Sequence, residues 1–324
     1  MRERRFILDV PAQTGGILRD ASLAYATWGA LNATADNAVL LPSHYTGTHE
    51  RWAALIGPGR ALDPARYFIV AVNLFGNGVS TSPSHGVAFP PLTIEDNIRA
   101  QHALLAHLGV RRLALVAGWS MGAMQALHWA MLFPAMVANV VAVCGTAFCW
   151  PVNTVFLLGI APILEAAPQA GEPLALALFG RAYCGWAYSA EFFRAALYRE
   201  LGFTSLEALL DDWARDHQQH RAADLLAVLR AWAGTARPRK AARAALRRIT
   251  ARCFIVPCET DSYFTVRDAR YEAKAIPDAR FLPLASPFGH CAGAPGRFTV
   301  EGARIEAIFI QALSQPGKDN PCSI

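Results

Sequence analysis

The 324-residue sequence predicts an α/β fold, in which a mostly parallel central sheet is flanked by helices and interrupted by an inserted helical cap domain. Two observations predict this architecture. Short β-branched runs alternate with longer helical patterns over most of the chain, as in a parallel sheet with helical connections. Between residues 151 and 240 the strand signals fade and helical stretches remain. We therefore expect a core built from residues 1–150 and 241–324, and a helical cap from residues 151–240.

The first half of the chain supplies most of the expected sheet. Segments 6–10 and 22–27 are typical of an antiparallel pair that turns at Thr14-Gly-Gly. A helix is expected over residues 93–108, where Thr93-Ile-Glu-Asp offers a cap and early acidic residues. The buried strands that follow the opening pair are expected at 39–42, 67–73, 113–117 and 137–144.

The second half first supplies the cap and then completes the core. Amphipathic helices are expected at 206–220 and 222–233, inside the cap. Strand signals return at 252–257 and 280–284, and a final helix is expected over 300–313. A helical block inside an α/β pattern is typical of an inserted cap domain.

Composition excludes several classes of protein. Hydrophobic residues make up 53% of the chain and charged residues 17%, which excludes disorder, collagen-like repeats and charged coiled coils. The net charge of +5 is small and scattered, so it does not indicate nucleic-acid binding. The basic cluster at 237–252 is better interpreted as the solvated face of a helix. Without a phosphate loop, a dinucleotide fingerprint or a metal-ligand cluster in the sequence, we expect no cofactor.

Seven cysteines without a C-x-x-C pair favour a reduced cytoplasmic setting, and the start of the chain shows no signal peptide. Residues 131–164 carry no charge and are long enough to span a bilayer. Proline and glycine interrupt that run, and the candidate catalytic residues lie on both sides of it and must converge. We therefore expect a buried strand followed by an apolar part of the cap, and no membrane span.

The most specific local motif is Gly118-Trp119-Ser120-Met121-Gly122, directly after the apolar run 113–117. A G-x-S-x-G sequence between a strand and a helix is typical of a nucleophile elbow, a tight turn that exposes the serine hydroxyl. Good helix formers follow Met121, as the elbow requires. This context favours the elbow over an ordinary glycine-rich turn, and Ser120 is the expected nucleophile.

A serine nucleophile needs a histidine base and a carboxylate that orients it. On this architecture both follow the serine in the chain, after late strands. The strand at 252–257 leads to Glu259 and Asp261, of which Asp261 sits in the loop proper and is preferred, with Glu259 as the alternative. His290 follows the strand at 280–284 and is preceded by a glycine, and no other of the nine histidines has this position.

Backbone N–H groups are expected to stabilise the oxyanion of the tetrahedral intermediate. The residue after the serine, Met121, supplies one, and the loop after the strand at 39–42 supplies the other, expected from Tyr45. His217 and His220 lie three residues apart on a predicted polar helix. A solvated helix face explains them better than a metal site does.

Several segments resemble the homoserine O-acetyltransferase branch of the α/β-hydrolase superfamily over nearly the whole chain. The resemblance implies the α/β-hydrolase fold, a triad of Ser120, Asp261 and His290, a tunnel through the cap to the serine, and a possible homodimer. The segments that carry it are Leu23-Ala-Tyr-Ala-Thr-Trp-Gly-Ala-Leu-Asn32, Asn37-Ala-Val-Leu-Leu, Thr46-Gly47, Leu62-Asp-Pro-Ala-Arg-Tyr-Phe-Ile-Val-Ala-Val-Asn73, and Ser-Met-Gly with Met124-Gln125.

The chain also departs from that branch. The transferases usually have Gly-Gly-Ser-Met-Gly-Gly at the elbow, whereas Trp119 and Ala123 replace two glycines here. Trp119 either narrows the pocket beside the serine or points into the core. The transferases place a cap arginine against the homoserine carboxylate, and Arg181 is the nearest candidate; the alternative is a solvent-facing or carbonyl-bound arginine. Thr46 and Trp119 complete the expected substrate contacts.

These observations favour a serine hydrolase, an esterase or amidase that acts on a small acyl substrate through an acyl-Ser120 intermediate. The alternative is an acyl-CoA-dependent O-acyltransferase that uses the same triad, with acetyl-CoA as co-substrate. A ligand receptor on a hydrolase scaffold is a third hypothesis, disfavoured by the intact triad. Hydrolysis is preferred because Trp119 is bulky and residues 151–164 offer no charge to a zwitterionic amino acid.

Overall fold

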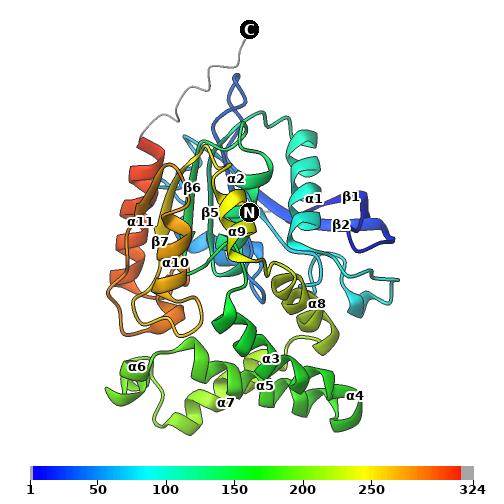
Figure 1. Ribbon diagram of the computed structural model, residues 1–324, viewed down its shortest axis with the longest axis vertical. Coiled ribbons are helices and arrows are strands. Elements are labelled where there is room, and N and C mark those ends of the chain that lie inside the picture. The colour runs from blue at the N-terminus through cyan, green and yellow to red at the C-terminus, as the bar shows by residue number, and fades with distance from the viewer. Residues whose placement is uncertain (1–2, 315–324) are drawn as a thin grey trace.

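A computed structural model describes residues 3–314 and contains one eight-stranded sheet, with strand order β1-β2-β4-β3-β5-β6-β7-β8 (Figure 1). The first two strands are antiparallel to each other, β2 is antiparallel to β4, and the remaining pairs are parallel. This confirms the predicted mostly parallel sheet. The strands are β1 (Glu3–Pro11), β2 (Ile17–Trp28), β3 (Ala38–Pro42), β4 (Phe68–Val72), β5 (Leu113–Trp119), β6 (Asn139–Val143), β7 (Arg252–Val256) and β8 (Ala279–Phe281).

The central strands are apolar throughout because both faces of the sheet are covered. Every residue of β3 and β6 is buried. Alternate residues point to opposite faces, so Leu40 and Val140 join one core, while Val39 and Val141 join a second core on the other side. The nucleophile strand β5 lies between β3 and β6, at the centre of this double-sided packing.

Helices cover both faces of the sheet. Residues of α1 (Ile94–His107), α2 (Met121–Leu132), α9 (Arg239–Leu246) and α10 (Val266–Ala273) belong to the first core, and those of α11 (Thr299–Ser314) to the second. Helix α1 starts at the predicted cap, where the side chains of Thr93 and Asp96 each accept from the other residue's backbone N–H.

Strand β8 is shorter than the sequence predicted. It ends at Phe281 instead of reaching residue 284. Backbone hydrogen bonds to the neighbouring segment continue past this end, because the N–H groups of Leu282 and Leu284 donate to the carbonyl oxygens of Ile255, at 2.9 Å, and Pro257, at 2.8 Å. Leu284 pairs again with Cys258 as an isolated bridge, and this contact holds the two loops that carry the candidate acid and base side by side.

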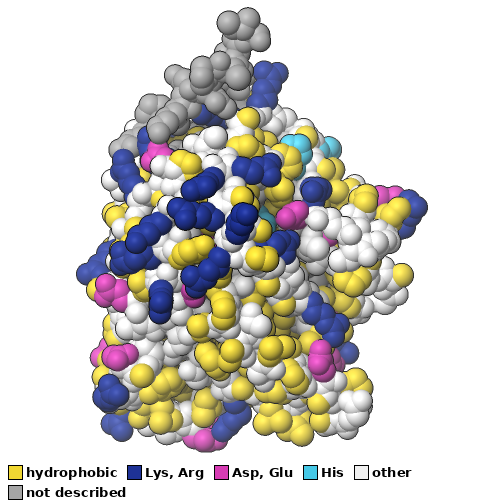
Figure 2. All heavy atoms as spheres, viewed as in Figure 1, with side chains coloured by type: hydrophobic (Ala, Val, Ile, Leu, Met, Phe, Trp, Pro, Cys, Tyr) yellow, Lys and Arg dark blue, Asp and Glu magenta, His cyan; other side chains and the backbone are white. Residues whose placement is uncertain are grey.

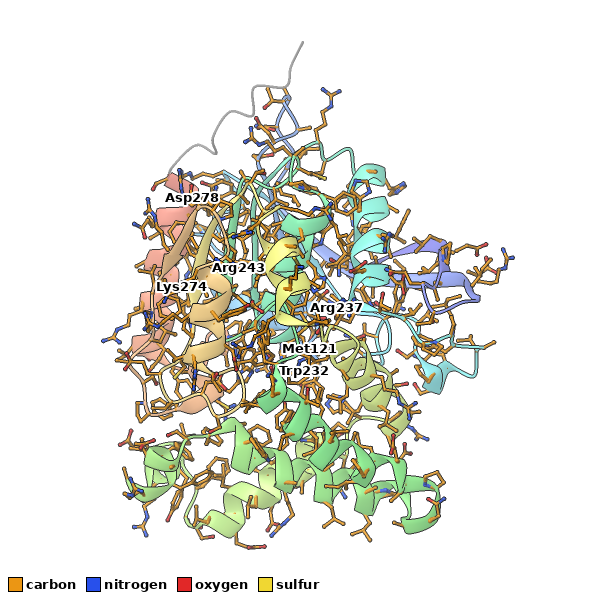
Figure 3. All side chains as sticks on the ribbon, viewed as in Figure 1. Met121, Trp232, Arg237, Arg243, Lys274 and Asp278 are labelled. Atoms are coloured by element: carbon orange, nitrogen blue, oxygen red, sulfur yellow. The ribbon has the colours of Figure 1, made fainter. Side chains whose placement is uncertain are left out.

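Of the seven α-helices between β6 and β7, the first six, α3 to α8, form a layer below the carboxyl ends of the strands in Figure 1. Among the packed pairs in this layer are α5 with α7 and α3 with α8. Figure 3 shows Met121, at the start of α2, at the end of the core that faces this layer. The helices are α3 (Pro151–Glu165), α4 (Ala167–Ala170), α5 (Glu172–Ala187), α6 (Ala190–Arg194), α7 (Leu206–His217) and α8 (Ala222–Ala233).

The charge-free run 131–164 contains the buried strand β6 and the cap helix α3, as expected from the sequence. By length and composition, Pro151–Ala170 is long and apolar enough to cross a membrane. A helix of a cap domain that buries one of its sides can be equally long and apolar. Helix α3 is of this kind, because its buried side packs on α5 and α8. The helix therefore gives only weak support to a membrane span.

Basic side chains gather on the face of the molecule over α9 and α10 (Figures 2 and 3). Within α9 the apolar residues Ala242 and Leu246 are buried, whereas Arg243 and Lys240 are exposed. The basic cluster is thus the solvated side of an amphipathic helix, as the sequence predicted.

Candidate active site

Ser120 occupies a strained turn between β5 and α2. Its φ of 59° and ψ of −126° lie outside the usual regions for a residue with a side chain. A Cβ on Gly118 would collide with the backbone of Gly122, and a Cβ on Gly122 would lie 2.7 Å from the carbonyl oxygen of Pro42. The close approach of these segments explains why the motif needs glycine two residues before and two residues after the serine.

Two buried backbone N–H groups flank the serine. Met121 begins α2, and Tyr45 follows β3. Among residues 3–314, the backbone N–H groups of Met121 and Tyr45 donate to no protein acceptor. Gln125 holds the two segments together, because its Nε2 donates to the carbonyl oxygens of Ser43, at 2.8 Å, and of Met121, at 3.2 Å. The start of α2 also carries the positive end of the helix dipole, which favours an anion at this point.

The imidazole of His290 is held by Asp261. Its Nδ1 lies 2.7 Å from Oδ2 of Asp261, and both residues are buried. The other carboxylate oxygen accepts from the backbone N–H groups of Tyr263, at 3.1 Å, and Phe264, at 2.9 Å. Because both oxygens are occupied, the carboxylate has one orientation. Glu259, the alternative acid, is exposed and its side chain makes no contact with His290 among residues 3–314.

Ser120 and His290 line one cavity of about 200 Å³ between the core and the cap. No hydrogen bond joins the two side chains within the described part of the chain, as is common in serine hydrolases without substrate. The structure brings Tyr45, Thr46 and Trp119 to the same cavity. The indole of Trp119 therefore lines the pocket, which settles the choice left open by the sequence. Aromatic rings make up much of the remaining wall: Tyr183, Trp213 and Tyr263.

Arg181 does not have the expected position. Its guanidinium pairs with Glu207, at 2.5 Å, and with Asp211, at 2.6 Å, and it does not line the cavity. The α5–α7 packing explains this, since it places the acidic residues of α7 next to the side chain. The expectation that Arg181 contacts substrate is therefore wrong.

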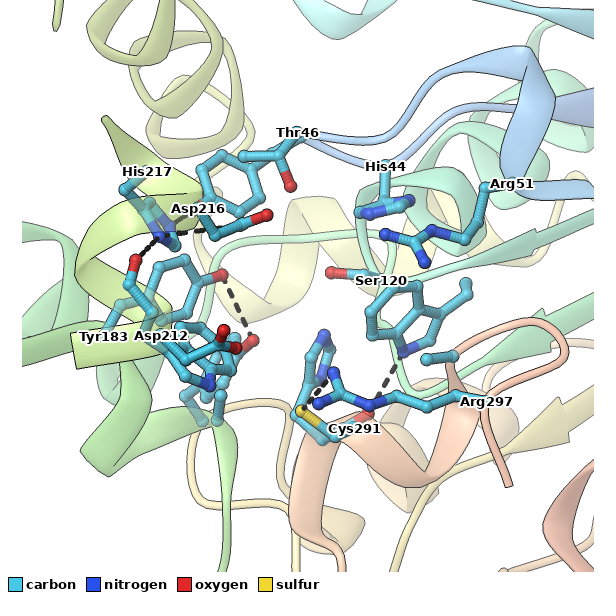
Figure 4. Close-up of a pocket in the computed structure, with 17 residues that line it drawn as sticks. His44, Thr46, Arg51, Ser120, Tyr183, Asp212, Asp216, His217, Cys291 and Arg297 are labelled. Atoms are coloured by element: carbon cyan, nitrogen blue, oxygen red, sulfur yellow. Dashed lines mark hydrogen bonds and ion pairs between the residues drawn. The ribbon is translucent and has the colours of Figure 1, made fainter. Parts of the chain in front are cut away.

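Charged residues that the sequence did not single out surround the pocket. Figure 4 shows Arg51 and Arg297 on one side of Ser120, and Asp212 and Asp216 on the opposite side. The two acidic residues belong to α7, so the cap does present charge to the pocket, although α3 does not. The segment 151–164 could not reveal this, because α7 begins 41 residues after the end of α3 and meets the pocket only in the folded chain.

His217 is buried, which corrects the expectation of a solvated helix face. Its Nδ1 donates to the carbonyl oxygen of Trp213, at 2.8 Å, and its Nε2 lies 2.6 Å from the hydroxyl of Tyr45. Burial lowers the pKa of His217 and raises that of Tyr45. The available sequence signal was Trp213, four residues earlier on the same helix face.

Burial also keeps His44 neutral. This imidazole packs against the indole of Trp119, with ring centroids 4.5 Å apart. Desolvation, reinforced by the nearby charge of Arg51, lowers the pKa of His44 to about 3. His44 is therefore part of the wall of the pocket and not a second base that competes with His290 near neutral pH.

Comparison with known proteins agrees with this geometry. A sequence profile for the alpha/beta hydrolase fold matches residues 37–162. An ethyl acetate hydrolase of Pseudomonas veronii is 34% identical over 331 aligned positions, which cover 95% of this chain and 94% of that enzyme. The chain belongs to the α/β-hydrolase family. The family predicted from the sequence is thereby confirmed.

Solved structures extend the match to the cap. The acetyl esterase MekB superposes on this α/β-hydrolase with a TM-score of 0.91 at 31% identity, over 96% of this chain and 97% of that one. A homoserine O-acetyltransferase of Trichormus variabilis is 39% identical, but the match covers 42% of this chain and 42% of the transferase. The esterases are therefore similar over the full length, whereas this transferase is similar over less than half.

Proposed function

We propose that this α/β-hydrolase cleaves small carboxylic esters, with acetate esters of short alcohols as the main substrate class. The observation that carries the proposal is the position of Ser120 on a strained elbow, in one small cavity with a His290 imidazole that is fixed by Asp261. The full-length similarity to an ethyl acetate hydrolase and to an acetyl esterase supports the substrate class.

In the first half of the proposed reaction, the Ser120 hydroxyl attacks the ester carbonyl while Nε2 of His290 takes its proton. Asp261 holds the proton on Nδ1 and stabilises the imidazolium that forms. The backbone N–H groups of Met121 and Tyr45 face the developing oxyanion, which is why they have no protein acceptor. The imidazolium then protonates the departing alcohol oxygen, and the acyl group stays on Ser120.

In the second half, water takes the place of the alcohol. His290 removes a proton from this water as it attacks the acyl carbon, and the same N–H groups stabilise the second oxyanion. Collapse of this intermediate releases the carboxylic acid and returns the proton to Ser120. A cavity of about 200 Å³ holds a small acyl group together with a small alcohol or a water.

Acyl transfer to an alcohol acceptor is the second candidate. Almost half of the chain is similar to homoserine O-acetyltransferases, and charged groups of both signs border the pocket. Arg181, the residue expected to hold a carboxylate, is engaged elsewhere. Hydrolysis remains the preferred function because the full-length relatives at 30% identity or more are esterases, whereas the transferase structures that match over the full length are at most 22% identical.

The deciding experiment supplies the wild-type enzyme with ethyl acetate, or with acetyl-CoA, in the presence and absence of homoserine. The proposal predicts acetate release from ethyl acetate without an acceptor and no stimulation by homoserine. Release of free CoA only when homoserine is added, with matching O-acetylhomoserine, would instead establish the transferase.

We further propose a cytoplasmic enzyme that works without a cofactor. The six cysteines within residues 3–314 are buried and unpaired, which supports a reducing compartment. The homodimer implied by the family resemblance stays a prediction, which size-exclusion chromatography with light scattering can test.

A further inference from the structure

Trp119 separates the active-site cavity from a second, apolar cavity. Trp119 lines the pocket with Ser120 and His290. It also lines a narrow space of about 10 Å³, which is about the room needed for one water, and Ala294 is the other residue that lines both cavities. The walls of this second cavity include Trp52, Val143, Ile305 and Phe309, none of which is charged. The cavity lies between β6, α11 and the short 3₁₀ helix η1 (His49–Leu55).

Several contacts hold the indole in this position. Its Nε1 donates to the carbonyl oxygen of His290, at 3.1 Å, and the indole and imidazole rings stack at 5.2 Å. The imidazole of His44 packs on it from another direction, at 4.5 Å. A Cβ on Gly293 would lie 2.6 Å from Cδ1 of the indole, so only glycine leaves room for the ring at that point. The indole is therefore a fixed wall and not a mobile side chain.

The reaction geometry shows which part of the ester meets this wall. The departing alcohol oxygen receives its proton from His290, so it must lie within about 2.6–3.2 Å of the imidazole. The carbonyl oxygen lies on the other side of the reacting carbon, at the N–H groups of Met121 and Tyr45. The alcohol carbons therefore lie next to the pocket side chains that pack on His290, namely Trp119 and Tyr263.

We propose that Trp119 sets the maximum size of the leaving alcohol, and that the apolar cavity behind it is a closed extension of the alcohol site. This inference rests on the proposed ester hydrolysis. With the indole in place, alcohols of short aliphatic chain fit the pocket. Without it, the two cavities join, and a longer alkyl chain gains apolar contacts worth about fourfold in kcat/KM for each buried methylene.

The test compares two substrate series in the wild type and in Trp119→Ala. The first series keeps the acetyl group and lengthens the alcohol from ethyl to hexyl. The second keeps ethanol and lengthens the acyl group from acetyl to hexanoyl. We expect the ratio of kcat/KM for hexyl acetate over ethyl acetate to rise by about tenfold or more in the variant, with little change in the acyl series. Ratios are independent of the fraction of active enzyme, so partial misfolding does not affect them.

Two further variants isolate the cause. Trp119→Phe removes the indole N–H but keeps a ring, and should keep the wild-type ratio. Gly302→Leu adds apolar volume at the rim of the second cavity, because Gly302 belongs to its lining and a Cβ there meets no atom within 4 Å. Leucine is also a better helix former than glycine in α11. We expect this substitution alone to leave ethyl acetate hydrolysis unchanged, and to cancel the gain of Trp119→Ala in the double variant.

An unchanged alcohol ratio in Trp119→Ala would overturn the proposal, as would an equal rise in the acyl series. A gain that survives Gly302→Leu would overturn the role assigned to the second cavity. Failure of the underlying ester hydrolysis has a different signature: Ser120→Ala would then retain the wild-type rate with ethyl acetate, whatever the alcohol ratio.

Discussion

The phenol oxygen of Tyr45 lies 2.6 Å from Nε2 of His217, and this hydrogen bond joins the loop after β3 to the cap helix α7. The carbonyl oxygen of Trp213 can only accept, so the proton of His217 is on Nδ1 and Nε2 carries the lone pair. Tyr45 is therefore the donor. Because the backbone N–H of the same tyrosine faces the proposed oxyanion, the cap helps to fix one donor of the oxyanion site.

Tyr45→Phe keeps this backbone N–H and the aromatic ring but removes the bond to His217. We expect kcat to fall by roughly 2–10-fold, in line with the loss of one buried hydrogen bond, while KM for a small ester changes less. Steady-state kinetics with ethyl acetate measure both. Tyr271→Phe is a matched control, because its hydroxyl does not line the pocket and donates to the carbonyl oxygen of Arg239. A change confined to KM would contradict the positioning role.

Asp261→Asn tests the assignment of the acid. An asparagine amide at this position holds His290 in the wrong tautomer, so we expect kcat to fall by about four orders of magnitude. Glu259→Gln is the control, and its effect should be small because Glu259 is exposed and remote from the imidazole. The opposite order of effects in the same assay would reassign the acid to Glu259.

Glu272 anchors the segment through which the chain enters the cap. Its carboxylate accepts from the backbone N–H groups of Ala147, at 2.6 Å, and Phe148, at 3.1 Å, and from the indole of Trp150, at 2.8 Å. Burial nevertheless raises the pKa of Glu272 to about 8, from 4.5. The folded state thus binds this proton more tightly than the unfolded chain, so this group's contribution to stability falls as the pH rises from about 4.5 to about 8.

The glutamine in Glu272→Gln cannot ionise, so the stability of this variant lacks the pH dependence that Glu272 contributes. Urea unfolding near pH 6 and near pH 8.5 measures the stability of both proteins. We expect the advantage of the wild type over Glu272→Gln to shrink by roughly 2 kcal/mol at the higher pH. An advantage that stays constant or grows with pH would show that the raised pKa is wrong.

Arg181→Ala should leave ester hydrolysis nearly unchanged. The guanidinium is partly exposed and its ion pairs with Glu207 and Asp211 lie outside the pocket, so we expect only a small loss of stability. Values of kcat and KM should stay within about twofold of the wild type. A large rise of KM in Arg181→Ala would instead show that Arg181 contacts the substrate.

Local patterns predicted the sheet, the elbow and the positions of the candidate acid and base, because each depends on neighbouring residues. Strand β5, the turn at Ser120 and the cap of α1 follow from residues within a few positions of one another. The partners of Arg181 depend on how α5 packs on α7, and the hydrogen bond of His217 to Tyr45 depends on the loop after β3 that meets α7. Both contacts join segments that are far apart in the sequence, so no local pattern predicts them. Histidine is a polar residue type, so the sequence suggested that His217 faces solvent. In the structure the side chain is instead held in the interior by its hydrogen bonds to Trp213 and Tyr45.

The central claim is that acyl transfer passes through Ser120, and intact-mass measurement during turnover tests it most directly. With p-nitrophenyl acetate, the wild type should carry one acetyl group that maps to the peptide containing Ser120. Ser120→Ala should carry none, keep its circular dichroism spectrum, and lose roughly three to six orders of magnitude in kcat. A variant that hydrolyses the ester within about tenfold of the wild-type rate, or an acetyl group on another residue of the active wild type, would contradict the account.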